Sequence, residues 1–225
     1  KNNSELTFFM INENPLNSPV IPQPTTPKGK ATVARILAEG HELFGQTGYV
    51  AMRMGDLAEK ANLSLGAIYR YFENKDDVFL AIINNIHQEL YAASRVNTNQ
   101  RFATHPYETI LLSNLGYLTH YLNHRHVMKA FIEATMVEKK YTDMWWYMRE
   151  SHIQRISNAL KRDYEMTELN GEPIRNTLEA LASMTEQSAF VWYAVPAAEE
   201  KVMAPEKAAK IVSDIWYHSL FYENR

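Results

Sequence analysis

The fold of this 225-residue chain is decided by residues 56–75, DLAEKANLSLGAIYRYFENK. Apolar residues recur in this stretch at helical spacing, and Asn62 is a residue type that readily takes a left-handed turn conformation between two short helices. Ser64 is placed to cap the second of these helices, which we expect to run through Phe72, and Asn74 is placed to cap the next one. Short amphipathic helices joined by tight turns indicate a helix-turn-helix.

The helical pattern continues on both sides of this stretch. Upstream, a first helix is expected to end at Gly48, and the first short helix of the motif covers about 54–61. No part of the chain shows sustained period-two alternation with β-branched enrichment, which is the mark of a strand. We therefore expect an all-α fold of about nine helices. After the fourth helix, the remaining five are expected near 106–123, 125–138, 141–165, 173–195 and 205–222.

The composition is that of a folded protein without an obvious membrane segment. Hydrophobic residues make up 46% of the chain, and 23 basic against 26 acidic side chains give a formal charge of −3. The absence of cysteine excludes disulfides, thiolate zinc sites and cysteine nucleophiles, and it fits a reducing compartment. The longest apolar run, 189–198, is about half as long as a bilayer span. We expect a soluble, cytoplasmic protein with no membrane partner.

Composition also divides the chain into parts. Residues 1–27 hold five prolines among Asn, Ser and Thr, which predicts a flexible arm. Residues 28–75 carry seven basic and five acidic side chains, a net charge of +2, whereas residues 76–225 carry fifteen and nineteen, a net charge of −4. The positive charge lies with the helix-turn-helix, which favours double-stranded DNA as its partner.

The stretch 56–75 closely resembles the DNA-binding segment of the TetR family, and the resemblance covers about residues 30–80. It implies that residues 28–75 form a DNA-binding domain with 64–72 as its recognition helix. It also implies that residues 76–225 form a ligand-binding and dimerisation domain. The matching residues outside the quoted stretch are Ile36, Leu37, Leu43, Phe44, Gly48, Tyr49, Asp77, Val78 and Phe79.

The resemblance places the DNA contacts on and beside the recognition helix, whose first turn would face base edges. Lys75 would bind a phosphate beside the N-terminus of the fourth helix, and Arg53 would replace a phosphate contact that the family commonly makes with Thr or Ser. Leu65 offers only apolar contact, for instance to a thymine methyl, so we expect Arg70 and DNA shape to provide much of the discrimination. The predicted DNA-binding residues are Arg53, Ser64, Leu65, Gly66, Ala67, Tyr69, Arg70, Tyr71 and Lys75.

The last two helices are the expected dimer interface. The resemblance implies that two protomers pair these helices into a four-helix interface, and residues 189–193 are apolar nearly all round, which independently suggests a partner. The alternative is that both helices complete the core of the monomer. The apolar stripe of the last helix consists of Ala208, Ile211, Val212, Ile215 and Ser219.

The middle helices concentrate large amphipathic side chains, which either line an apolar pocket or fill an ordinary core. Segments 184–190 and 214–225 resemble the mycobacterial ethionamide-regulator subgroup, whose members hold a long, mostly apolar ligand. This implies a small hydrophobic or amphipathic effector, although Arg149 and His152 depart from the apolar lining and would admit a carboxylate or phosphate. The implied pocket residues are Asn114, Tyr117, Tyr121, Trp145, Arg149, His152, Ile156, Thr185 and Trp216.

Metal binding and enzyme chemistry are less favoured by the sequence. His120, His124 and His126 end one helix, and a histidine pair four residues apart can hold a transition metal if a carboxylate joins it. No such carboxylate lies in the local pattern, so we expect a solvated polar helix end and no metal. No phosphate-binding glycine loop, nucleophile elbow or zinc-protease helix is present, so we expect neither catalysis nor a cofactor.

The sequence as a whole predicts a ligand-responsive repressor. As a homodimer it would place two recognition helices in successive major grooves of a pseudo-palindrome, about 34 to 36 Å apart, and release the DNA when an effector binds. Repression rather than activation follows from the family analogy. Two other functions stay open: an enzyme acting in the same cavity, which would need convergent acid–base residues, and a scaffold that has lost DNA affinity. The scaffold alternative rests on three positions where the family often has polar residues and this chain does not: Met52, Gly55 and Leu65.

Overall fold

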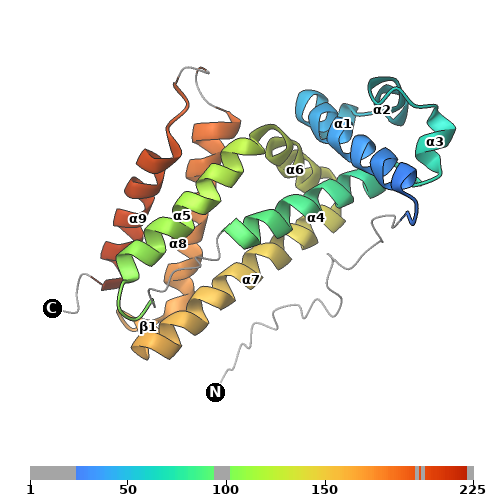
Figure 1. Cartoon of the computed structure of the whole chain (residues 1–225). Coiled ribbons are helices and arrows are strands. Elements are labelled where there is room, and N and C mark those ends of the chain that lie inside the picture. The colour runs from blue at the N-terminus through green and yellow to red at the C-terminus, as the bar shows by residue number, and fades with distance from the viewer. Residues whose placement is uncertain (1–23, 94–101, 196–197, 199–200, 222–225) are drawn as a thin grey trace.

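The computed structural model describes residues 24–93, 102–195, 198 and 201–221. This part of the chain contains nine α-helices, one π-helix and one short hairpin, which confirms the predicted all-α class (Figure 1). The helices α1 (Pro27–Ala51), α2 (Met54–Lys60) and α3 (Leu65–Tyr69) form what we call the head. What we call the body contains α4 (Lys75–Ala93), α5 (Pro106–Asn123), α6 (Arg125–Val137), α7 (Lys139–Tyr164), α8 (Ile174–Ala189), the π-helix η2 (Phe190–Ala194) and α9 (Pro205–Phe221).

Most helix ends lie where the capping residues predicted them. The side chain of Ser64 accepts the N–H of Ala67 at 3.2 Å, and that of Asn74 accepts the N–H of Asp77 at 3.0 Å. Asn62 takes the left-handed conformation between α2 and α3, with φ of 50°. The recognition helix α3 is shorter than expected, because the chain turns after Tyr69 rather than continuing as a regular helix to Phe72.

Two features of the body differ from the expected helices. The segment predicted as one helix over 173–195 is α8 followed by the wider turns of η2. Before α8, the strands β1 (Glu168–Leu169) and β2 (Glu172–Pro173) pair in an antiparallel hairpin. Asn170 and Gly171 both have positive φ in its turn, which is the Asn-Gly hairpin signal, but strands of two residues are too short to show an alternating pattern.

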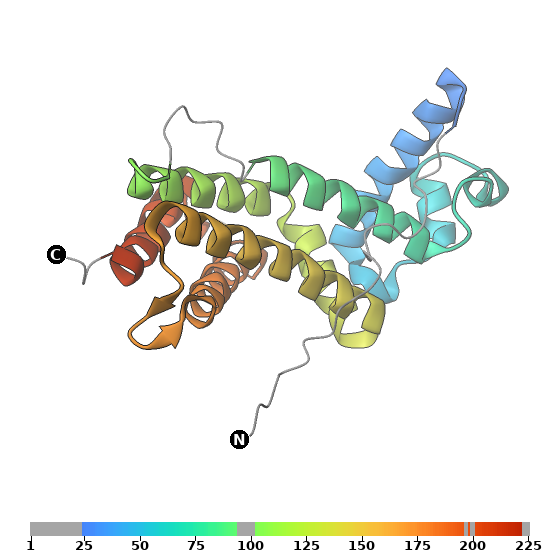
Figure 2. The ribbon, with the colours of Figure 1, turned by 90° about the horizontal axis from the view of Figure 1, so that it is seen from below.

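The helices enclose two hydrophobic cores. The first joins the head to α4, α6 and the start of α7, and the second joins α5, the rest of α7, α8, η2 and α9. The first core crosses the predicted boundary after residue 75, so the head packs directly on the body. Figures 1 and 2 show α4 and α7 both running from the head into the body, with α5, α8 and α9 at the end away from α2 and α3.

The N-terminal arm falls largely outside the described residues, since description begins at residue 24. Pro27, assigned to the arm, is the first residue of α1, and the side chain of Thr26 caps this helix by accepting the N–H of Gly29 at 3.1 Å. Among the helices of the described ranges, none is both long and apolar enough to cross a membrane.

Candidate DNA interface, joint and ligand cavity

The helix α3 presents an open surface at the end of the head. Its buried side is anchored by Ile68 and, just beyond the helix, by Phe72, both in the first core. Leu65 and Tyr69 are 40% and 48% exposed, which is unusual for side chains of this size. A Cβ atom on Gly66 would meet nothing within 4 Å, so this side of α3 is free of protein contacts.

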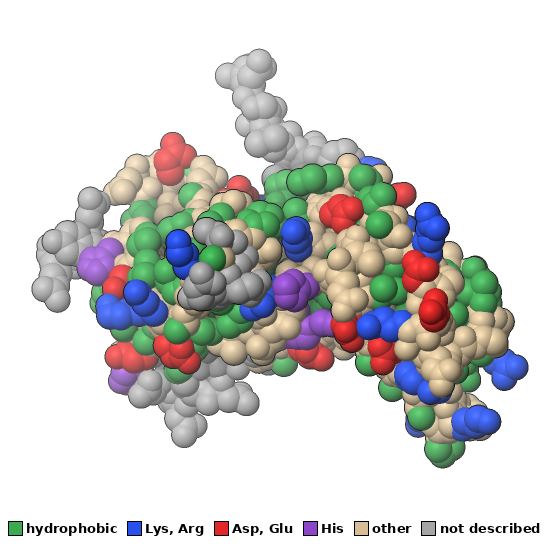
Figure 3. Space-filling model, turned by 90° about the horizontal axis from the view of Figure 1, so that it is seen from above, with side chains coloured by type: hydrophobic (Ala, Val, Ile, Leu, Met, Phe, Trp, Pro, Cys, Tyr) green, Lys and Arg blue, Asp and Glu red, His purple; other side chains and the backbone are tan. Residues whose placement is uncertain are grey.

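Six of the nine predicted DNA-binding residues are exposed, while Ala67, Tyr71 and Lys75 are half-buried. Figure 3 shows Lys and Arg side chains projecting from this end of the molecule, where Arg53 and Arg70 belong to the exposed set. The fold therefore gathers the predicted residues on one face, although their contacts with DNA remain a prediction. The exposed residues are Arg53, Ser64, Leu65, Gly66, Tyr69 and Arg70.

Lys75 has an internal role that the sequence did not indicate. Its ammonium group donates to the carbonyl oxygens of Tyr49 at 2.9 Å and Val50 at 3.1 Å, and it lies 4.6 Å from the centroid of the Tyr49 ring. An ammonium group has three N–H donors, so a phosphate could take only the one that remains. Lys75 is first of all the side chain that holds the end of α1 against the start of α4.

The neighbouring residue, Asp76, connects three helices. Its carboxylate accepts the hydroxyls of Tyr49 at 2.5 Å and Tyr141 at 3.1 Å, and it pairs with the ammonium group of Lys140. Burial alone would raise the pKa of Asp76, but these donors outweigh it and hold the pKa below its ordinary value. We call Tyr49, Asp76, Lys140 and Tyr141 the joint, because they tie the end of α1 to the starts of α4 and α7.

The backbone that enters the joint is shaped by Gly48. This residue has φ of 81° and ψ of 173°, a conformation open to glycine and costly for other residues. The following N–H groups of Tyr49 and Val50 point at the carboxylate of Glu133 in α6, at 2.9 and 3.4 Å. A Cβ atom at position 48 would overlap this carboxylate, so the head can meet the body in this way only with glycine there.

A cavity of about 370 Å³ lies in the body between α5, α7, α8 and α9. Six of the nine predicted pocket residues line it: Asn114, Tyr117, His152, Ile156, Thr185 and Trp216. The other lining residues were missed, although helical spacing from the predicted ones on α5 and α7 would have found several of them. They are Phe102, Thr109, Ile110, Ser113, Arg155, Ala159, Arg162, Ala182, Glu186 and Leu220.

The other three predicted pocket residues lie outside this lining. Tyr121 is buried in the second core, where its ring packs near those of Tyr117 and Tyr193. Trp145 packs against the first core, with the guanidinium of Arg149 5.5 Å from its ring centroid. Trp145 and Arg149 lie outside the lining because α7 turns this part of its surface toward the head and α8 rather than toward the cavity.

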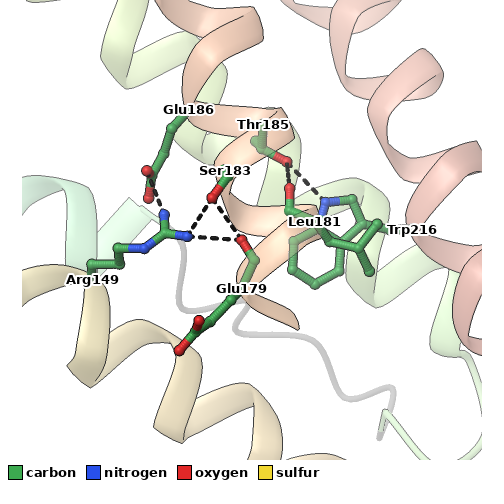
Figure 4. A network of polar contacts seen from close by, with 7 residues as sticks. All are labelled: Arg149, Glu179, Leu181, Ser183, Thr185, Glu186 and Trp216. Atoms are coloured by element: carbon green, nitrogen blue, oxygen red, sulfur yellow. Dashed lines mark hydrogen bonds and ion pairs between the residues drawn. The ribbon is translucent and has the colours of Figure 1, made fainter. Parts of the chain in front are cut away.

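Arg149 already donates three hydrogen bonds to α8 (Figure 4). Its guanidinium donates to the carboxylate of Glu186 at 2.5 Å, to the hydroxyl of Ser183 at 2.6 Å and to the carbonyl of Glu179 at 2.7 Å. The expected ligand carboxylate or phosphate on Arg149 would have to displace Glu186. The wall near Glu186 thus presents a neutralised ion pair rather than an unpaired positive charge.

Three further polar residues of the wall are hydrogen-bonded within the protein. The indole N–H of Trp216 donates to the hydroxyl of Thr185 at 2.8 Å, and that hydroxyl donates to the carbonyl of Leu181 at 2.9 Å. The amide of Asn114 donates to the hydroxyl of Ser213 at 3.0 Å. Because these groups are satisfied internally, the cavity suits a mostly apolar molecule with few polar groups of its own.

Comparison with known proteins agrees with this arrangement. Residues 36–82, which span most of α1, the helix-turn-helix and the start of α4, match the family of bacterial regulatory proteins called tetR. The chain belongs to the tetR family. It is therefore a DNA-binding transcriptional regulator.

More distant similarity of this tetR-family regulator extends over the body. The chain is 22% identical to the HTH-type transcriptional regulator EthR of Mycolicibacterium smegmatis, over 87% of this chain and 88% of that protein. Among solved structures, it has the fold of the TetR family regulator PfmR from Thermus thermophilus, with 20% identity, a TM-score of 0.63 and coverage of 83% and 98% of the two chains. A TerR/AcrR family regulator from Aquifex aeolicus is 18% identical with a TM-score of 0.64, covering 82% of this chain and 97% of that one.

The last helices of this tetR-family regulator carry apolar side chains on two sides. Ala208 and Val212 of α9 are buried in the second core, so that part of the predicted stripe belongs to the monomer. Ile211 and Ile215 of the same helix are 38% and 43% exposed. On η2 and just after it, Val191 and Val195 are also exposed, so an apolar surface is left over once the core is complete.

The histidines at the end of α5 are not the solvated helix end that the sequence predicted. His120 is buried, and its Nε2 atom lies 2.9 Å from the carbonyl oxygen of Ile86 in α4. His124 is half-buried, with its Nδ1 atom 2.9 Å from Nε2 of His41 in α1. These contacts arise because α4 and α1 pack over the end of α5, which local spacing cannot reveal.

In the cavity wall of the tetR-family regulator, His152 is held in its neutral form. The guanidinium of Arg155 donates to its Nδ1 atom at 3.1 Å, which requires that nitrogen to be unprotonated. Burial, together with the charges of Arg155 and Arg149, lowers the pKa of His152 to about 4. At neutral pH, His152 therefore offers the cavity an uncharged imidazole.

We expect His152 to make the free energy of unfolding fall as the pH falls from about 6.5 to about 4. In this interval the His152 imidazole binds a proton in the unfolded chain but stays neutral in the folded chain. The gap between the two pKa values corresponds to about 3 kcal/mol at most. Urea denaturation at about pH 7 and about pH 4.5 would measure this loss in the free energy of unfolding. The His152→Gln variant should lose less stability than the wild type over this interval, and the variant of an exposed histidine, His105→Gln, should behave like the wild type. Equal losses in the wild type and His152→Gln would contradict this assignment.

Proposed function

We propose that this tetR-family regulator is a homodimeric repressor that releases a pseudo-palindromic operator when a small, largely apolar effector enters the cavity of the body. The observation that carries the proposal is the exposed face of α3 at one end of a chain whose other end contains a cavity of about 370 Å³. Such a protein would act on DNA in the cytoplasm.

The DNA-binding step uses the exposed face of the head. In a helix-turn-helix, the second helix lies in the major groove while the first crosses the backbone, which assigns α3 to the bases. Tyr69 and Arg70 extend from the exposed end of α3, and Arg53 stands at the start of α2. We assign Arg53 to phosphate contact and the face with Leu65 to direct contact with the bases.

Dimerisation supplies the second copy of α3. Ile211 and Ile215 lie one turn apart on α9, and Val191 and Val195 are exposed on and just after η2, which continues α8 in the predicted interface. Exposed apolar side chains of this size, grouped on the last helices, favour a second copy of the chain as their cover. The interface we propose is therefore narrower than the full stripe, because Ala208 and Val212 already belong to the core.

A route from the cavity to the head runs through α5 and α4. Asn114 and Tyr117 of α5 line the cavity, and His120, one turn further, bonds to the carbonyl of Ile86 in α4. The first turn of α4 contains Asp76 of the joint, which holds the end of α1. An effector that displaced α5 would shift α4 and so change the placement of the head, with a coupling free energy of roughly 1 to 3 kcal/mol.

The Arg53→Ala variant tests the DNA-binding step, because Arg53 is the exposed residue that we assign to phosphate contact. Loss of a phosphate contact should weaken binding to random duplex DNA and reduce the slope of log affinity against log salt by about 0.9 between about 50 and 200 mM salt, measured by fluorescence anisotropy. The Lys161→Ala variant is the control. It removes the same charge from an exposed position near the C-terminal end of α7, away from the head, and it should bind DNA like the wild type. If the two variants bind DNA equally well, the proposed interface is wrong.

The double variant Ile211→Glu, Ile215→Glu tests the dimer. Burying four carboxylates per dimer without partners is costly, so this variant should sediment as a folded monomer where the wild type sediments as a dimer. Met136→Glu serves as the control, because Met136 of α6 is 79% exposed and lies outside the proposed interface. A double variant that remains dimeric would place the interface elsewhere.

A further inference from the structure

Three ligand-type side chains from two helices meet where the head joins the body. They are Glu89 of α4 and His120 and His124 at the end of α5, whose nearest carboxylate oxygen and imidazole nitrogens all lie within 4.8 Å of one another. The carboxylate that the local sequence pattern lacked is thus supplied by a residue more than thirty positions away. Figure 3 shows histidine side chains gathered on this surface, midway between the two ends of the molecule.

The hydrogen bonds of His120 prepare it as a ligand. A carbonyl oxygen can only accept, so the Nε2 atom of His120 must carry the proton that it donates to Ile86 at 2.9 Å. The lone pair is then on Nδ1. In metal sites the histidine nitrogen that does not bind the metal almost always donates to a carbonyl, carboxylate or water in this manner, which fixes the ring and its tautomer.

His124 is held in a similar way by α1. Its Nδ1 atom is 2.9 Å from Nε2 of His41, and its Nε2 atom is 3.5 Å from a carboxylate oxygen of Glu89. When Nδ1 of His124 carries the proton and donates to His41, Nε2 has a free lone pair beside the Glu89 carboxylate. Burial lowers the pKa of both His120 and His124, so both rings are neutral and able to bind a metal near neutral pH.

The spacing suits a small metal ion. Bonds of 2.0 to 2.2 Å place two donor atoms of a tetrahedral centre roughly 3.3 Å apart, close to the 3.5 Å between His124 and Glu89. The remaining donor distances, up to 4.8 Å, need a closing movement of about an ångström and a half. Glu89 can supply this movement because its side chain is exposed, and that exposure also gives an ion access from solvent.

We propose that Glu89, His120 and His124 bind a divalent transition-metal ion of the Zn²⁺ type, with solvent completing its coordination. Two imidazoles favour Zn²⁺, Ni²⁺ or Co²⁺ over Mg²⁺ and Ca²⁺, which take oxygen ligands. His41 belongs to the head, so the ion would link α4, α5 and, through His124, α1. The metal would restrain the head against the body at a point separate from both the joint and the cavity.

The test is a titration of the tag-free full chain with Zn²⁺ by calorimetry, repeated with Co²⁺ to follow its visible absorption. We expect one ion per protomer in the wild type. Glu89→Gln should weaken binding at least about tenfold, since ligand removal should cost no less than loss of a supporting residue. This variant changes an exposed side chain, and circular dichroism would verify its fold.

The control is His126→Gln, which removes an exposed histidine two residues from His124 and outside the cluster. It should bind Zn²⁺ like the wild type. The proposal is overturned if the wild type shows no saturable binding, or if Glu89→Gln binds as tightly as the wild type. It is also overturned if His126→Gln loses binding to the same extent as Glu89→Gln, because the ion would then lie on the surface histidines.

Discussion

The carboxylate of Asp76 is the interaction on which the arrangement of this regulator depends. A partly buried charge is costly unless it is paired, and here two tyrosine hydroxyls and one ammonium group satisfy it. The donors come from the end of α1 and the start of α7, while Asp76 itself lies in the first turn of α4. This small site therefore fixes the end of α1 against α4 and α7, and the proposed DNA-binding surface and the cavity lie on opposite sides of it. Lys75 and Glu133 strengthen the same site by binding the backbone of residues 49 and 50.

In the mechanism that we propose, this arrangement couples the two ends of the protein. The cavity wall contains polar groups that are already paired, so the apolar effector that we propose would act mainly by filling space and moving helices. α5 connects that wall to α4 through His120, and α4 connects to the head through Asp76. The histidine cluster lies on the same path, at the contact of α1, α4 and α5. A metal ion there would therefore act on the equilibrium that an effector shifts, from a different place.

The sequence predicted what depends on near neighbours and failed where distant residues meet. Ser64 and Asn74 are caps whose partners lie three residues away, and both were identified. The bonds of Lys75 to the carbonyls of Tyr49 and Val50 are not evident from the sequence, because these partners are 26 and 25 residues away. The pairing of Arg149 with Glu186, 37 residues away, is equally hidden from the sequence, as is the contact between Glu89 and His124. Resemblance located six of the cavity residues, since it carries information on packing that spacing alone does not contain.

The central claim, that the exposed face of α3 recognises a specific DNA sequence, is tested most directly by selecting bound sequences from a pool of randomised duplex DNA. The wild type should enrich a palindrome whose half-sites are about one helical turn apart, or a multiple of this, as two copies of α3 in a dimer require. The Tyr69→Ala variant, with its fold checked by circular dichroism, should enrich that palindrome weakly or not at all. If the folded, dimeric wild type enriches no sequence at low or moderate salt, the claim is wrong, and a protein that has kept the fold but lost DNA recognition takes its place.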